Sequence, residues 1–149
     1  MTSAAGRTLR AVLGESQKEL LAEWIQAQLA ASTLRADLMK ENELREQSRE
    51  LLALLQPAVE SGDLESLGGP EWTSVREFLT RVSRSRVQQG FTASATATFI
   101  FSLKEPLFAR LRKASVKDAD ALGAEMWIAT TLLDRLGLYT VEEIGRAHV

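Results

Sequence analysis

The sequence predicts an all-α protein, built as a single domain of about five to six helices. Apolar residues recur three and four positions apart along most of the chain, and no stretch alternates as a strand would. Three prolines and nine glycines leave little room for low-complexity linkers. With 149 residues, of which 45% are hydrophobic and 26% charged, the chain is long enough to bury one core.

The predicted domain is organised around a central helix over residues 91–113. One side of this helix carries an apolar line formed by Ile100, Leu103, Leu107 and Leu111. Three phenylalanines flank this line: Phe99, Phe101 and Phe108. Lys104 projects into this apolar arc, and Pro106 removes the backbone donor that would bond to the carbonyl of Ser102. We therefore expect a kinked helix with neighbours on several sides.

Two helices are expected before it at the start of the chain, over residues 8–31 and 36–60. Their apolar stripes consist of Leu9, Leu13, Leu20 and Trp24 in the first, and Leu44, Leu51, Leu52, Leu55 and Val59 in the second. Pro57 should bend the last turn of the second helix, and Gly62 should end it.

A third helix should follow the loop over residues 61–69, with Pro70 in its first turn and Gly90 closing it. Its apolar stripe consists of Trp72, Val75, Phe78, Leu79 and Val82. Thr92 is then placed to cap the central helix. The small residues TASATAT at the start of the central helix predict a tight helix crossing or self-association.

Beyond the central helix, Ser115 and Asp118 have the form of a capping box. The helix that they open should bury Leu133 and Leu136, with Trp127 widening the apolar face, and should end at Gly137. A second capping box, Thr140 and Glu143, is accompanied by Tyr139 and Ile144 at the staple positions. It predicts that a new helix begins at Thr140, and we expect the natural protein to continue past Val149.

The charges are segregated along the chain although the net charge is only −2. Residues 15–71 hold five basic and twelve acidic residues, and residues 72–117 hold nine basic and two acidic ones. Acidic helices packed beside basic helices account for this pattern. A nucleic-acid surface is the alternative, but neither the overall charge nor a known motif supports it.

The residue types needed for common catalytic and cofactor chemistry are scarce. Cysteine is absent, and the one histidine, His148, lies next to the C-terminus, so we expect no metal site and no catalytic triad. A globin-type haem would need Tyr139 or a methionine as its axial ligand. We expect the carboxylates on charged faces, and no phosphate-binding glycine motif occurs. The sequence predicts no enzyme and no cofactor, and without a membrane span or signal peptide the default location is the cytoplasm.

The segments TATFIFSLKEPLFARL, LLDRLGLYTVEE and LLAEWIQAQL resemble the N-terminal sensor domain of stressosome RsbT co-antagonist proteins of the RsbRD type. The resemblance implies a helical domain related in fold to non-haem globins, which usually dimerises and precedes a linker helix and a phosphorylatable STAS domain. It also implies that the domain senses stress for a partner-switching system. Residues 1–139 would be the sensor domain and residues 140–149 the start of the linker helix. The sequence itself holds no STAS segment.

Two functions follow as hypotheses. In the first, a signalling sensor in a homodimer relays a change through residues Leu138, Tyr139, Thr140, Glu143 and Ile144. Such a sensor could bind a small apolar or acidic molecule in a pocket made by Lys104, Phe99, Phe101, Phe108 and Trp127. Alternatively, Lys104 is structural and reaches a carboxylate or the solvent. In the second hypothesis, the domain is a ligandless dimerisation or docking module that pairs through TASATAT and the last two helices.

Overall fold

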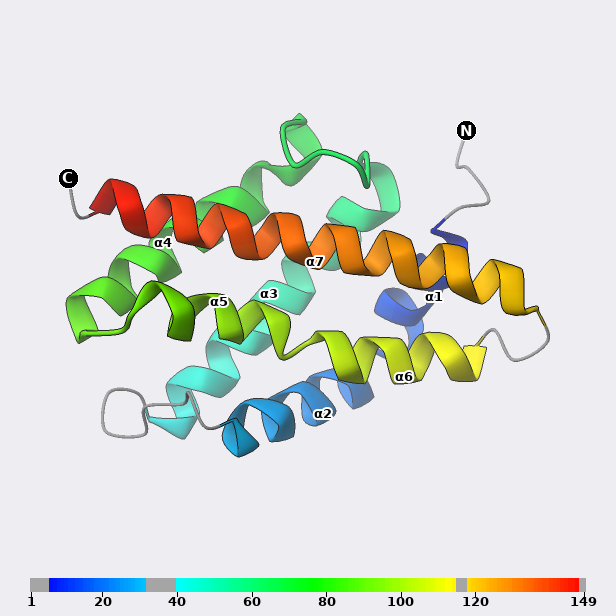
Figure 1. Cartoon of the computed structure of the whole chain (residues 1–149), viewed down its shortest axis with the longest axis horizontal. Helices are drawn as coiled ribbons and strands as arrows, with labels where there is room; N and C mark the ends of the chain where they lie inside the picture. Colours follow the sequence, from blue (N-terminus) through cyan, green and yellow to red (C-terminus); the bar gives the residue numbers. More distant parts are fainter. Residues whose placement is uncertain (1–5, 32–39, 115–117, 148–149) are drawn as a thin grey trace.

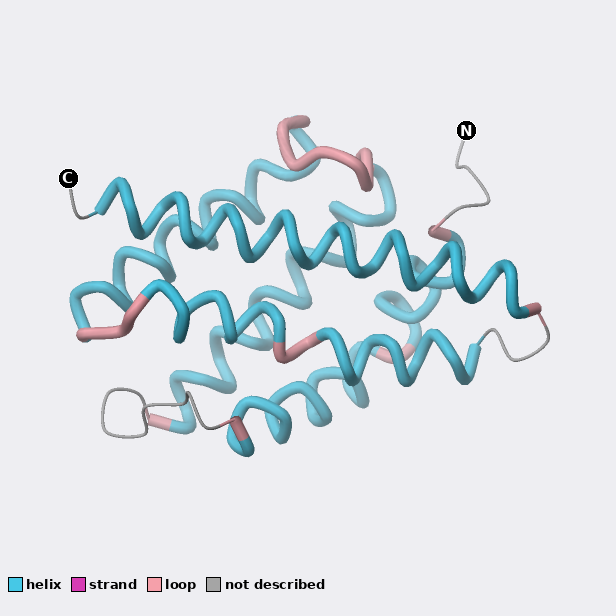
Figure 2. Tube along the Cα trace, viewed as in Figure 1, coloured by secondary structure: helices cyan, strands magenta, loops and turns pink. Residues whose placement is uncertain are grey.

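The computed structural model describes residues 6–31, 40–114 and 118–147, which form helices joined by short connections (Figure 2). The elements are α1 (Arg7–Glu15), α2 (Gln17–Ala30), α3 (Glu41–Ser61), the 3-10 turn η1 (Pro70–Trp72), α4 (Thr73–Gln89), α5 (Ala93–Phe101), α6 (Lys104–Ala114) and α7 (Ala119–Ala147). No strand occurs in these residues. The all-α class is confirmed, and the globin-like arrangement stays a prediction.

The longest helix, α7, runs along the long axis of the molecule (Figure 1). Its 29 residues span about 43 Å at the helical rise per residue. The consecutive helices α5 and α6 lie beside it in the opposite direction, while α3 and α4 lie behind (Figure 1). Because α4, α5 and α6 all pack on α7, one side of this helix faces the core and the other side faces solvent.

The predicted first helix is divided in two at Ser16, where α1 ends and α2 begins. Gly14 and Ser16 are weak helix formers, which makes this a favourable place for a bend. Leu9, Leu13 and Leu20 are buried on both sides of it, as predicted. The apolar stripe was therefore correct although the helix is not continuous.

The second predicted helix begins at Glu41, while residues 36–39 lie outside the described part of the chain. It continues through Pro57 to Ser61, whose hydroxyl donates to the Pro57 carbonyl at 3.0 Å. Gly62 then ends the helix in an extended conformation. The predicted apolar residues Leu44, Leu51, Leu52, Leu55 and Val59 are all buried.

The signals at both ends of α4 are confirmed. Pro70 occupies the first turn of η1, which leads directly into α4. At the other end, Gly90 adopts a left-handed conformation with φ of 96°, and the Phe91 N–H donates to the Arg86 carbonyl at 2.9 Å. Thr92 caps α5 as predicted, accepting from the Ala95 N–H at 3.0 Å.

The predicted central helix is interrupted at Ser102 and Leu103, four residues before Pro106. Proline lacks the donor for the Ser102 carbonyl and crowds it, which disfavours a regular helix at this point. Leu103 N–H turns to the Ile100 carbonyl at 3.1 Å, which leaves the Phe99 carbonyl without its helical donor. The Trp24 indole N–H replaces it at 3.1 Å, and the Ser102 hydroxyl donates to the same carbonyl at 2.8 Å.

The predictions for the last helix need correction. It begins at Ala119, and Asp118 caps it by accepting from the Ala121 N–H at 3.1 Å, while Ser115 lies outside the described residues. No new helix begins at Thr140, because α7 continues through Gly137 and Thr140 to Ala147. The Thr140 hydroxyl donates to the Gly137 carbonyl at 2.6 Å instead of accepting from an N-terminal amide, so the pattern is not used as a cap.

Two carboxylates among the described residues are buried, contrary to the expectation that the carboxylates lie on charged faces. Glu125 of α7 accepts from the Gly6 N–H at 2.5 Å and from the Leu9 N–H at 2.8 Å, so it caps the start of α1 from the far end of the chain. A carboxylate there complements the unpaired amides and the positive end of the helix. Glu143 is the second, and it pairs with Arg146 at 2.5 Å.

The acidic and basic halves of the sequence pack together, which confirms the interpretation of the charge pattern. Arg81 of α4 pairs with Glu50 of α3, and Arg110 of α6 pairs with Glu23 of α2. Both pairs join helices from opposite halves.

Candidate functional site

The large apolar side chains that stay exposed gather on one face of the molecule. In the described part of the chain they are Trp127 (70% exposed), Leu138 (59%) and Val141 (39%) of α7, with Phe101 (36%) of α5 beside them. Trp127, Leu138 and Val141 are separated by eleven and three residues, so they share one side of the helix. The prediction that Trp127 belongs to the buried face is wrong. We call Trp127, Asp134, Leu138 and Val141 the α7 strip.

The opposite side of α7 fixes the direction in which this strip points. Ala129, Leu133 and Leu136 are buried in the core, so the strip faces outward. Phe101 lies close against the helix at Gly137, where an added Cβ would come 2.4 Å from its ring. This contact lies at the last residue of α5, outside TASATAT, so the tight crossing or self-association predicted at those small residues stays a prediction.

Lys104 brings a charge to the border of the strip. Its ammonium nitrogen lies 2.7 Å from the Asp134 carboxylate and 4.7 Å from the centre of the Phe101 ring. The side chains of Lys104 and Asp134 are 31% and 47% exposed, so water screens the pair and its present contribution to stability is small. The ammonium thus reaches a carboxylate, in agreement with the structural interpretation of Lys104.

The five residues of the predicted ligand pocket do not meet in one place. Lys104 and Phe101 are in contact beside α7, and Trp127 is exposed on that helix. Phe99 is buried and stacks on Trp24, with 5.1 Å between the ring centres. Phe108 packs against the core and is partly buried. The residues therefore divide between the surface and the interior.

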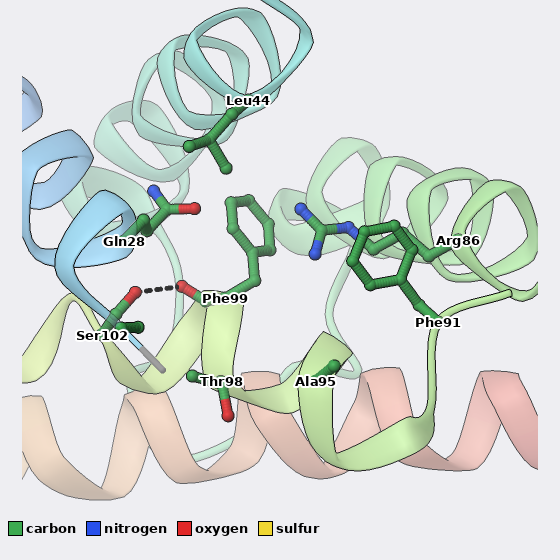
Figure 3. Close-up of a pocket in the computed structure, with 9 residues that line it drawn as sticks. Gln28, Leu44, Arg86, Phe91, Ala95, Thr98, Phe99 and Ser102 are labelled. Atoms are coloured by element: carbon green, nitrogen blue, oxygen red, sulfur yellow. Dashed lines mark hydrogen bonds between the residues drawn. The ribbon is translucent and has the colours of Figure 1, made fainter. Parts of the chain in front are cut away.

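A second polar feature, which the sequence did not reveal, surrounds Arg86 (Figure 3). This arginine of α4 is 3% exposed. Its guanidinium lies between two aromatic rings, 4.5 Å from the centre of Phe99 and 5.1 Å from that of Phe91. It donates to the Gln47 side chain at 3.0 Å. Burial lowers the pKa of Arg86 to about 10, against the opposing effect of the nearby Glu43 charge, and leaves it protonated at neutral pH.

A cavity of about 20 Å³ adjoins this arginine. Residues of α2, α3, α4 and α5 line it, among them Gln28, Leu44, Phe99 and Ser102 (Figure 3). The buried Gln28 is held by a bond of 2.8 Å from its amide to the Ser48 hydroxyl. A cavity of this volume has room for about one water molecule. It cannot take an organic ligand without movement of the side chains around it.

Replacing Arg86 by alanine should lower the free energy of unfolding by about 2–4 kcal/mol, because the contacts of its stem and of both rings are lost. Arg86→Met should stay within about 1 kcal/mol of the wild type. The methionine side chain fills much of the same space. It carries no charge, so the variant avoids the cost of burying the protonated guanidinium, which destabilises the folded state at pH values below about 10. Urea unfolding at pH 7 measures both. Equal losses for the two variants would contradict this explanation.

The predicted signal-transmitting residues lie on consecutive turns of α7 but face different surroundings. Leu138 is exposed, whereas Thr140, Glu143 and Ile144 are buried. The Tyr139 hydroxyl is 3.1 Å from the Thr80 hydroxyl of α4. The last turns of α7 are thus attached to α4 on one side and present the strip on the other.

The described residues contain neither a metal-binding cluster nor a membrane-spanning helix. No group of three or more histidine, cysteine, aspartate or glutamate side chains there could hold a metal ion. None of the described helices is both long and apolar enough to cross a membrane.

These features define a small all-α domain whose last helix has one face in the core and one apolar face in solvent. Residues 18–148 match the family model of the RsbT co-antagonist protein rsbRD N-terminal domain. The chain belongs to this family, and the resemblance seen in the sequence is confirmed. The family implies a stressosome-related signalling role. No curated protein and no solved structure gave a significant match.

Proposed function

We propose that this domain is a non-enzymatic sensor module of a stressosome-type protein, and that two copies pair through the α7 strip. The observation that carries the proposal is the gathering of exposed apolar side chains on α7 and the adjacent Phe101. Apolar groups of this size gathered on one face are typical of a contact surface. Proteins of the stressosome are the proposed partners of the whole assembly, on the basis of the family.

A second copy of the chain is the occupant that fits this surface best. Lys104 and Asp134 place opposite charges side by side within it, so the surface is complementary to itself. A symmetric dimer uses the same patch on both subunits, which requires that kind of complementarity.

The end of α7 would carry the signal onward. We assign residues up to 139 to the sensor body and the residues from Thr140 to the transmitting segment, although both belong to one continuous helix. Exposed Leu138 alternates with buried Thr140 and Ile144 on the same turns. A change in the pairing of the strip would therefore shift the side chains that attach this end of α7 to the domain.

A ligandless dimerisation module is the second candidate function. The volume of the Arg86 cavity agrees with it, because about 20 Å³ leaves no room in that cavity for a small apolar or acidic molecule as the side chains stand. In both candidate functions, the sensor module and the dimerisation module, the domain acts through the pairing of α7 between two copies.

Hydrogen exchange at two protein concentrations tests the relay. Dilution that dissociates the dimer should speed amide exchange in residues 138–147, since the pairing that restrains this end of α7 is lost. Exchange in α3, behind α7, should not change and serves as the internal control. Identical exchange of residues 138–147 in dimer and monomer would contradict the relay.

A further inference from the structure

On the exposed side of α7, one apolar pair and one glycine pair are equally spaced about Asp134. Trp127 lies seven residues before Asp134 and Val141 seven residues after it, which is about 10 Å along the helix in each direction. Gly123 and Gly145 lie eleven residues before and after. An added Cβ at either glycine would meet nothing within 4 Å, so both ends of this side are open.

We propose that the two α7 helices of the dimer pair antiparallel, with the two-fold axis at Asp134 and with Lys104 of each copy shared between both Asp134 carboxylates. The inference rests on the proposed self-association and adds its register. A two-fold axis perpendicular to the helix places each residue opposite the one equally far on the other side of Asp134. Trp127 of one copy then covers Val141 of the other, and the adjacent Leu138 lies against the same indole.

The charges explain why this register is chosen. A residue on a two-fold axis meets its own copy, so two Asp134 carboxylates approach each other and repel. Lys104 lies 2.7 Å from Asp134 in each copy, and the two lysines place two positive charges beside the two negative ones. The four charges alternate around the axis and attract.

A displaced register would lose this arrangement. If one helix slid by a turn, a Lys104–Asp134 pair would face an apolar side chain of the other copy. The pair would then lose its contact with water and gain no charged partner in exchange. Polar groups within an apolar seam commonly set register and orientation in this way. Trp127 and Leu138 therefore supply the attraction, while Asp134 and Lys104 set the alignment.

Mixing two charge-reversed variants tests the proposal. Lys104→Glu places four negative charges at the axis of its homodimer, and Asp134→Lys places four positive charges there. Each homodimer should dissociate more readily than that of the wild type. In a mixed dimer opposite charges face each other between the copies, although each copy repels internally. We expect native mass spectrometry to show mixed dimers in at least about tenfold excess over the statistical amount.

The Arg81–Glu50 pair, which joins α4 to α3 and includes no residue of the strip, gives a matched control. Mixing Arg81→Glu with Glu50→Lys should give only the statistical amount of mixed dimer. The wild-type chain is measured in parallel. If it dimerises and the Lys104 and Asp134 variants mix only statistically, or if the control pair shows the same excess, the register is wrong while the proposed function stands. If the wild-type chain is a monomer throughout, both fail.

Discussion

Replacing Trp24 by alanine should lower the free energy of unfolding by about 3–5 kcal/mol, the range for removing a large aromatic side chain from a packed core. Trp24 is fully buried and stacks on Phe99. Its indole N–H also donates to the Phe99 carbonyl and, at 2.9 Å, to the Ser102 hydroxyl. The variant therefore loses both core packing and the donor that stabilises the interruption between α5 and α6.

Trp24→Phe separates these two contributions. Phenylalanine keeps most of the stacking, and the Ser102 hydroxyl still donates to the Phe99 carbonyl at 2.8 Å, so that carbonyl keeps a partner. The loss should be only about 1–2 kcal/mol. Chemical unfolding followed by circular dichroism measures both variants. A loss below about 1 kcal/mol for Trp24→Ala would show that this tryptophan does not hold α2 to the central helices.

Leu138→Glu should weaken self-association on the order of 100-fold while leaving the fold intact. The side chain is 59% exposed, so glutamate meets water in the monomer. In the dimer it would be buried against Trp127 of the second copy, beside the two Asp134 carboxylates, and would be both desolvated and repelled. Sedimentation velocity over a range of concentrations measures the effect.

Ala53→Glu is the matched control for this variant. Ala53 is exposed on α3, which lies behind α7 (Figure 1), and the change introduces the same side chain into a helix. It should leave self-association unchanged. Equal behaviour of the two variants would place the contact surface somewhere other than the α7 strip.

The buried side of each helix could be predicted from the sequence because helical spacing alone determines it. Ile100, Leu103, Leu107 and Leu111 are buried as their spacing required. Pro106 predicted the kink, but its consequence appears four residues earlier, where the Ser102 carbonyl loses its helical donor. The position of the break also depends on Trp24, which comes from a distant part of the chain.

Features that depend on contacts between distant residues could not be predicted. Glu125 looks like an ordinary surface residue in the sequence, yet it caps α1 at the other end of the chain. Gly137 looked like a helix end, but its missing side chain makes room for the Phe101 ring. Arg86 lies outside the predicted apolar stripe of its helix, yet it is buried between two phenylalanines.

The candidate site was only partly visible in the sequence. Lys104 was singled out in the sequence as a charge among apolar residues, and its ammonium lies 4.7 Å from the centre of the Phe101 ring. Trp127 was placed in the core because it widens the apolar arc of its helix, and periodicity cannot tell whether a neighbour covers that arc. The width of this apolar arc was the signal in the sequence for an exposed strip, because one layer of neighbouring helices cannot cover so wide an arc.

The mass of the unaltered chain in solution tests most directly whether two copies meet at α7. Light scattering coupled to size-exclusion chromatography should give about twice the chain mass of 16.4 kDa at high concentration, falling toward a single chain on dilution. A mass of one chain at every concentration would contradict the account.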